Sequence, residues 1–130
     1  MIQVGTVWTY IFAPNVDNKV AGKWIYEGNA DLFRQLCPKL NKLADNGAIN
    51  MAKFANKNPR HDPCPYIKNS VLCVYTHKPR DKKIRLIIKN ELDLWSETYK
   101  TEEQTNQEWR PGGILFEQYA HYWKNKRGFL

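Results

Sequence analysis

Apolar and polar positions alternate over several short stretches of the chain, which is the pattern of half-buried β-strands. Residues 3–13 read QVGTVWTYIFA and are rich in β-branched and aromatic types, so we predict a strand there that is buried on both faces. The following stretch, 14–22, contains Asn, Asp and Gly and predicts a loop. Further strands are predicted at 23–27, 49–55, 71–76, 93–100 and 114–122.

One stretch, 29–45, instead repeats its apolar residues at spacings of three and four, which predicts a helix. Asn29 is a suitable N-cap for it, and Asn46-Gly47 is a suitable stop. Pro38 lies inside the pattern, so we expect the helix either to kink there or to divide into two. The repeating apolar residues are Leu32, Phe33, Leu36, Leu40, Leu43 and Ala44.

The segment 81–91 fits two patterns. Ile84, Ile88 and Leu92 are spaced as on one face of a helix, whereas Ile84, Leu86 and Ile88 alternate as in a strand. A proline shortly before the segment and an aspartate at its first position favour the helix, because they suit a helix start.

Polar stretches separate these elements. Residues 56–69 (NKNPRHDPCPYIKN) contain three prolines and predict an exposed loop. Residues 101–104 (TEEQ) match a capping box and predict a short helix, and residues 110–113 (RPGG) predict a turn. Strands and helices are mixed without strict alternation, so we predict an α+β fold in a single domain spanning residues 1–130.

The net charge of +7 is concentrated in the middle of the chain. Residues 53–90 carry ten Lys or Arg against two Asp, whereas residues 91–108 carry one Lys against six Asp or Glu. Concentrated charge of one sign attracts ions of the other sign, so we expect a partner that carries phosphate or carboxylate groups. The alternative is a solvated basic face that binds nothing.

The three cysteines, Cys37, Cys64 and Cys73, are odd in number and lack CxxC spacing. This favours reduced thiols in a cytoplasm, and we expect neither a metal site nor a cofactor. His61 lies three residues before Cys64, but structural zinc needs four ligands. No apolar run reaches the roughly 18–20 residues that span a bilayer, and the first residues do not read as a signal peptide, so no membrane partner is expected.

A predicted strand leads directly into a basic turn at 77–85 (HKPRDKKIR). Such a turn at the start of a helix can present cations and backbone N–H groups to an anion. Phosphate groups favour several cations, particularly the forked guanidinium of Arg. The predicted phosphate-binding residues are Arg80, Lys82, Lys83 and Arg85, with Lys78 and His77 beside them.

Aromatic residues make up 13% of the chain, and several adjoin a cation. This combination is typical of proteins that stack bases and hold their phosphates, although most rings are expected in the core. The pairs are Lys23-Trp24, Trp109-Arg110 and Trp123-Lys124. We expect Trp109 and Trp123 to be the most exposed, and Trp24 or Trp109 to be the first to stack a base.

Four stretches, in order along the chain, carry a resemblance to a known family. They are Gly22-Lys23-Trp24, residues 47–53 (GAINMAK), residues 72–76 (LCVYT), and Tyr99-Lys100-Thr101-Glu102 with Thr105. The chain resembles the small Bles-type proteins of the phosphothreonine-lyase-domain family, whose fold is similar to that of the cap-binding translation initiation factor 4E.

This resemblance implies a curved, mostly antiparallel sheet backed by two or three helices, and it supports a helix at 81–91. The cap-binding relatives hold a base between Trp rings and its phosphates with Lys or Arg. The connection between Thr76 and Asp93 is shorter here than is usual in the family, and the catalytic motifs of phosphothreonine lyases are not found. That activity is therefore not carried over.

We therefore expect a non-enzymatic binding protein for a phosphorylated ligand, either a nucleotide or a short single-stranded nucleic acid. The predicted ligand-binding residues are Arg80, Lys82, Lys83, Arg85, Lys78, Lys23, Trp24, Trp109, Arg110 and Lys100. A second hypothesis is a phosphate-directed lyase or hydrolase, in which His77 is the acid and a lysine such as Lys82 is the base. A third is a small viral or bacterial inhibitor whose basic face docks on an acidic protein surface.

Overall fold

The computed structural model describes residues 1–17, 19–57, 69–110, 113–114 and 117. Within them, six strands form one antiparallel sheet in the order β1-β2-β4-β5-β3-β6. The elements are β1 (Ile2–Val4), β2 (Trp8–Phe12), β3 (Gly22–Gly28), α1 (Ala30–Asp45), β4 (Met51–Ala55), β5 (Ser70–Thr76), α2 (Lys82–Leu92), β6 (Thr98–Thr101) and α3 (Glu102–Glu108). The predicted α+β class, with a curved antiparallel sheet and three helices, is confirmed.

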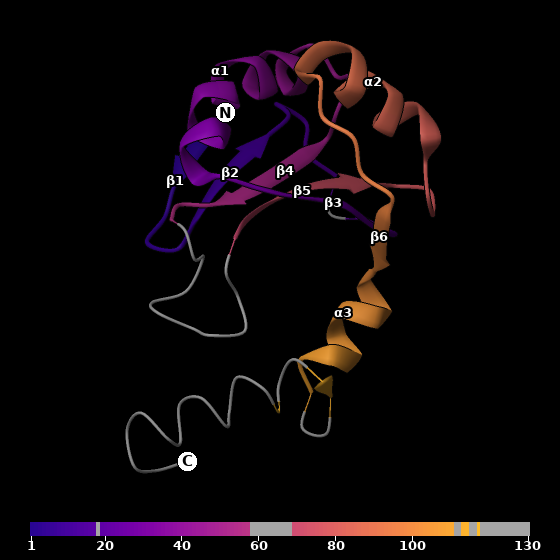
Figure 1. The fold of residues 1–130 in the computed structure, drawn as a ribbon. Coiled ribbons are helices and arrows are strands. Elements are labelled where there is room, and N and C mark those ends of the chain that lie inside the picture. Colours follow the sequence, from indigo (N-terminus) through magenta and orange to yellow (C-terminus); the bar gives the residue numbers. More distant parts are fainter. Residues whose placement is uncertain (18, 58–68, 111–112, 115–116, 118–130) are drawn as a thin grey trace.

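The two faces of this sheet differ. Figure 1 shows α1 and α2 over one face, which we call the helix-covered face, and α3 on the other side, beyond β6. Helix α1 packs against β2, β4 and β5, and it also contacts α2. We call the face directed away from α1 and α2 the open face.

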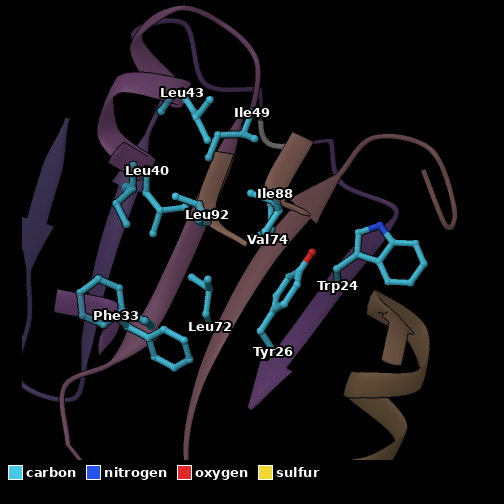
Figure 2. Close-up of a cluster of buried hydrophobic side chains, with 14 of the residues drawn as sticks. Trp24, Tyr26, Phe33, Leu40, Leu43, Ile49, Leu72, Val74, Ile88 and Leu92 are labelled. Atoms are coloured by element: carbon cyan, nitrogen blue, oxygen red, sulfur yellow. The ribbon is translucent and has the colours of Figure 1, made fainter. Parts of the chain in front are cut away.

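The core lies between the helix-covered face and the two helices, as Figure 2 shows. Its largest fully buried side chains include Trp24, Phe33 and Phe54. The rings of Trp24 and Tyr99 meet edge to face, with their centroids 5.1 Å apart. Aromatic rings bury a large area per residue, so this cluster contributes much of the stability of a chain of 130 residues.

Helix α1 forms as its residues predict. Asn29 is the N-cap, and its side chain accepts a hydrogen bond from the backbone N–H of Asp31 at 2.7 Å. The helix continues through the exposed Pro38 to Asp45, so it is not divided in two. Gly47 follows with a φ of 81°, a left-handed conformation that glycine adopts without steric cost.

The segment after β5 is a helix, as predicted. Asp81 caps α2 by accepting a hydrogen bond from the backbone N–H of Lys83 at 3.0 Å. Ile88 and Leu92 are buried in the core, and Asp93 ends the helix with a φ of 55°. The helical spacing of the apolar residues therefore outweighs their partial alternation.

Helix α3 begins at the predicted capping box. The side chain of Thr101 accepts a hydrogen bond from the backbone N–H of Gln104 at 3.0 Å. The side chain of Gln104 in turn accepts one from the backbone N–H of Thr101 at 2.9 Å. The TEEQ signature was therefore sufficient to predict the start of this helix.

The prediction of a single strand at 3–13, buried on both faces, is wrong. The stretch forms a hairpin of β1 and β2, in which the backbone N–H of Gly5 donates to the carbonyl of Trp8 at 2.8 Å. Gly5 interrupts the β-branched run, and the residues of β1 are exposed because that strand is at the edge of the sheet. The turn was missed because the β-branched and aromatic residues on both sides of Gly5 read as one continuous strand.

Two other strands were predicted with the wrong extent. Of the predicted strand 93–100, only the end is a strand. The backbone of Asp93 is in the left-handed conformation. The side chain of Ser96 accepts a hydrogen bond from the backbone N–H of Thr98 at 3.0 Å, which forms a local turn. The strand at 114–122 is wrong at Ile114 and Glu117, which are helical, and the rest of it lies outside the described residues. The central part of the loop at 56–69, the turn residues 111–112, and Trp123-Lys124 also lie outside them.

Candidate functional site

The alternation of strand residues divides neighbouring side chains between the two faces. Trp24 belongs to the core of the helix-covered face, so Lys23 and Ile25 belong to the open face. The same alternation in β6 puts Tyr99 in the core and Lys100 on the open face. Two lysines of the predicted set thus reach the open face by strand geometry alone.

Strand pairing then brings these lysines together. Lys23 is directly opposite Lys100 on β6 and opposite Tyr75 on β5. Lys53 of β4 is directly opposite Cys73, one row further along the same face. Like charges on directly opposite residues destabilise a sheet, so the pairing of Lys23 with Lys100 costs folding free energy except in so far as the ion pair of Lys100 with Glu108 offsets it.

A cleft of about 350 Å³ lies over this part of the open face. Its floor is apolar and includes Ile25, Val71 and Cys73. Trp8 comes from β2, and Trp109 directly follows α3. Among the described residues, the lining is Trp8, Lys23, Ile25, Lys53, Val71, Cys73, Lys100, Thr105, Glu108 and Trp109.

The three lysines of the cleft are held in different ways. The Nζ atom of Lys53 lies 3.9 Å from the centroid of the Trp8 ring. The Nζ atom of Lys100 lies 2.6 Å from the Oε2 atom of Glu108, in an ion pair. Lys23 is only 7% exposed, its Nζ atom lies 5.6 Å from the centroid of the Tyr75 ring, and it makes no ion pair among the described residues. A buried charge normally has a counter-charge, so Lys23 is the least compensated cation of the cleft.

Two polar atoms of α3 are also uncompensated. The Oγ1 atom of Thr105, which lines the cleft, is buried and has no hydrogen-bond partner within the described part of the chain. The Oε1 atom of Glu102 is also buried and without a hydrogen-bond partner in this part of the chain. Buried polar atoms in folded proteins are nearly always hydrogen-bonded, so these two atoms are exceptions within the described part of the chain.

Tyr75 contributes a neutral phenol next to Lys23. Burial is the main cause that raises the pKa of Tyr75 above its ordinary value of 10.0, and the nearby Cys73, Glu102 and Tyr10 raise it further. The phenol therefore stays protonated at physiological pH and supplies no negative charge to Lys23.

The structure divides the predicted ligand-binding residues into two groups on opposite sides of the sheet. Lys23, Lys100 and Trp109 line the cleft, and Arg110 directly follows Trp109 and is exposed. The other group belongs to α2 and the turn before it, on the helix-covered side, and consists of Lys78, Arg80, Lys82, Lys83, Arg85 and the underlying Trp24.

Arg85 of this second group is bound within the protein. Its guanidinium carbon lies 4.6 Å from the centroid of the Trp24 ring and 4.3 Å from that of Trp95, so it is stacked between two indoles. It also donates a hydrogen bond to the carbonyl of Ser96 at 3.4 Å. These contacts tie α2 to the core and to the segment that follows it.

The expectation that Trp24 stacks a base is wrong, because this side chain is only 2% exposed. Its indole N–H donates to the carbonyl of Asp81 at 2.9 Å, beneath the start of α2. A large ring with one polar atom suits such a position, since it fills the core while its N–H remains hydrogen-bonded.

The residues of the enzymatic hypothesis lie in different surroundings. His77 is exposed, its Nδ1 atom lies 2.6 Å from the carbonyl oxygen of Lys19, and it lines a separate hollow that also includes Asp81 and Asn50. Lys82 is exposed at the first position of α2 and does not line that hollow. The His61 and Cys64 pair, which was considered as a metal site in the sequence, lies outside the described residues.

Seven of the described lining residues are absent from the predicted ligand-binding set: Trp8, Ile25, Lys53, Val71, Cys73, Thr105 and Glu108. Trp8 was assigned to a strand buried on both faces, and Thr105 was considered only as part of a resemblance. Lys53 carried a usable signal, because it is the one charged residue in the apolar stretch INMAKFA. A single cation at an alternate position of a strand marks the face that is not fully covered.

No group of three or more His, Cys, Asp or Glu side chains within the described ranges is arranged to hold a metal ion. Among the helices that the structure describes, none is both long and apolar enough to cross a membrane. Comparisons of the chain with protein-family models, with curated proteins and with solved structures find no match in any of the three. The resemblance to Bles-type proteins therefore stays a prediction.

Proposed function

We propose that the cleft binds a phosphorylated ligand with an aromatic base, either a nucleotide or a short single-stranded nucleic acid. The observation that carries this proposal is Lys23, a buried lysine that lines the cleft opposite a second lysine and lacks a carboxylate partner among the described residues. A phosphate group beside Lys23 would supply the counter-charge that Lys23 lacks, whereas Lys100 already has one in Glu108.

The aromatic and apolar groups support the base-binding part of the proposal. Trp8 and Trp109 supply ring faces, and the floor of Ile25, Val71 and Cys73 excludes water without competing for hydrogen bonds. A volume of about 350 Å³ falls within the range of small-molecule sites. The proposal thus joins cations and rings that the sequence places far apart.

Binding without turnover fits the lining of the cleft better than catalysis does. Within the described part of the chain, the lining contains one carboxylate, Glu108, which is paired with Lys100, and no histidine. General acid–base chemistry usually requires such groups in hydrogen-bond reach of the substrate. A cytoplasmic location, suggested by the odd number of cysteines and their lack of CxxC spacing, belongs to the same proposal.

The test is calorimetric titration of the protein with nucleoside mono- and triphosphates and with a short oligothymidylate. We expect Lys23→Met to abolish binding while the free energy of unfolding stays the same or rises, because the substitution removes a buried charge and a like-charge pair. Trp8→Ala should weaken binding about tenfold, as expected for the loss of one stacking ring. Affinity for the oligonucleotide should fall steeply as salt is raised.

The matched control is Lys39→Met, which removes the same charge from an exposed position of α1. It should leave binding unchanged apart from a small electrostatic effect. If Lys23→Met binds as well as the wild type, or if no nucleotide or oligonucleotide binds at all, the proposal is wrong. Loss of binding only in Lys82→Glu/Lys83→Glu would move the site to α2.

A further inference from the structure

Helix α2 and the segment that follows it carry two large apolar side chains that are not part of the core. Leu86 is 55% exposed in the middle of the helix, and Trp95 is 52% exposed in the segment that follows it. Helix α2 lies on the helix-covered side of the sheet, whereas the proposed ligand cleft is on the open face. We call Lys82, Lys83, Leu86, Lys89 and Trp95 the α2 surface.

Trp95 is held in place although it is exposed. One side of its ring lies on the guanidinium of Arg85, which itself rests on the buried Trp24. The indole of Trp24 is fixed in turn by its hydrogen bond to the carbonyl of Asp81. A ring fixed in this way loses little conformational freedom when a partner covers it, which is a property of binding hot spots.

The charge around Leu86 is positive. Lys82 and Lys83 precede it by four and three residues and Lys89 follows it by three, so all three lysines are its neighbours on the helix surface. Asp81 caps the helix and Asp93 pairs with Lys89 at 2.6 Å. That pairing lowers the pKa of Asp93 through a hydrogen bond from Lys89 and the charge of Lys89. Glu91 is exposed five residues after Leu86, on another side of the helix, and Glu97 is exposed two residues after Trp95.

We propose that the α2 surface docks an acidic protein segment, which places apolar groups against Leu86 and against Trp95 and carboxylates beside Lys82 and Lys83. Interfaces of this type combine a central apolar contact with Trp and Arg and a charged rim. The aliphatic Leu86 at the centre favours a protein over a nucleic acid, because a base gains little from stacking on an aliphatic side chain. The proposal does not depend on the cleft.

The probe is a displayed library of helical peptides with apolar anchors. Its flanking positions are acidic in one pool, basic in a second, and Asn or Ser in a third. The full-length protein is the bait. We expect enrichment of the acidic pool only, with an apolar anchor retained in every selected sequence.

The selected peptide is then measured by fluorescence anisotropy against variants of the protein. Trp95→Ala and Leu86→Ser should each weaken binding about tenfold, and Lys82→Glu/Lys83→Glu should abolish it. The matched control is Lys39→Glu/Lys42→Glu on α1, which makes the same change in net charge at exposed positions of the other helix. It should retain most of the affinity, and thermal melts of each variant verify folding.

Every other result overturns the proposal. Equal losses in the α1 and α2 charge variants would mean that only net charge attracts the peptide. Enrichment of the neutral or basic pools, or of none, would mean that the α2 surface does not select acidic segments. Binding of an oligonucleotide that depends on Trp95 and Lys82, without peptide binding, would assign the surface to nucleic acid instead. Because Trp8→Ala and Lys23→Met leave the α2 surface intact, they should not change peptide affinity.

Discussion

The two faces of the sheet use the same residue types for different purposes. On the helix-covered face, Arg85 is stacked between Trp24 and Trp95 and helps to close the fold. On the open face, Lys53 lies against Trp8 at the margin of a cleft that the described elements leave accessible to a ligand. A cation next to a Trp therefore does not by itself indicate a binding site. What covers that face of the sheet decides between a structural and a binding role.

The contrast between Trp24 and Trp8 leads to the largest expected effect. We expect Trp24→Ala to lower the free energy of unfolding by about 3–5 kcal/mol, because it leaves a large cavity and removes a support of Arg85. Trp8→Ala should cost about half of that or less, since Trp8 is only partly buried. Urea denaturation followed by circular dichroism measures both values.

Two further measurements make this comparison stricter. Trp24→Phe should recover part of the lost stability, because it refills most of the volume but cannot donate to the carbonyl of Asp81. Ligand binding should show the opposite order, with Trp8→Ala losing affinity and Trp24→Phe keeping it. Similar losses of stability for Trp24→Ala and Trp8→Ala would mean that the two faces are equally buried in solution.

A smaller effect is expected at the start of α2. We expect Asp81→Ala to lower the free energy of unfolding by about 1 kcal/mol, because it removes the cap on the backbone N–H of Lys83. Asp81→Asn should restore most of this loss, since the amide oxygen can accept the same hydrogen bond. If Asp81→Ala instead created phosphate binding at α2, the carboxylate would have been blocking an anion site rather than only capping a helix.

This cap also shows how far the sequence alone could predict the structure. Local signals were sufficient for α1, α2 and α3, because Asn29, Asp81 and Thr101 each bond to a backbone N–H within three residues of themselves. The β1–β2 turn was missed because Gly5 lies within a β-branched run, and the one feature that opposes a continuous strand there is this glycine.

The cleft was only partly predictable for a different reason. Lys23 and Lys100 were in the predicted set, but their direct opposition follows from the pairing of β3 with β6, which no local pattern specifies. Lys53 joins them through β4 and β5 in the centre of the sheet. Conversely, Lys82, Lys83 and Arg85 are close in sequence, and this closeness suggested a site. The fold instead uses Arg85 to hold α2 in place.

The smallest effect at neutral pH concerns a buried tyrosine on each face. On the helix-covered face, burial raises the pKa of Tyr26 from 10.0 to about 12, against the opposing charge of Arg85. The hydroxyl of Tyr26 is buried and has no hydrogen-bond partner among the described residues. We therefore expect Tyr26→Phe to leave stability at pH 7 unchanged or slightly higher, because the substitution removes a polar group that the core does not satisfy.

Above pH 10 the same substitution should become clearly stabilising. The unfolded chain loses the phenolic proton near pH 10, whereas folded Tyr26 keeps it up to about pH 12, so its contribution to stability is full below pH 10 and is lost as the pH rises toward 12. Tyr26→Phe removes this loss, and its free energy of unfolding should fall less steeply than that of the wild type over this range. Tyr75→Phe is the matched variant on the open face, where burial also raises the pKa. Parallel pH profiles for Tyr26→Phe and the wild type would show that water reaches the Tyr26 hydroxyl and that the helix-covered face is less tightly closed than its packing indicates.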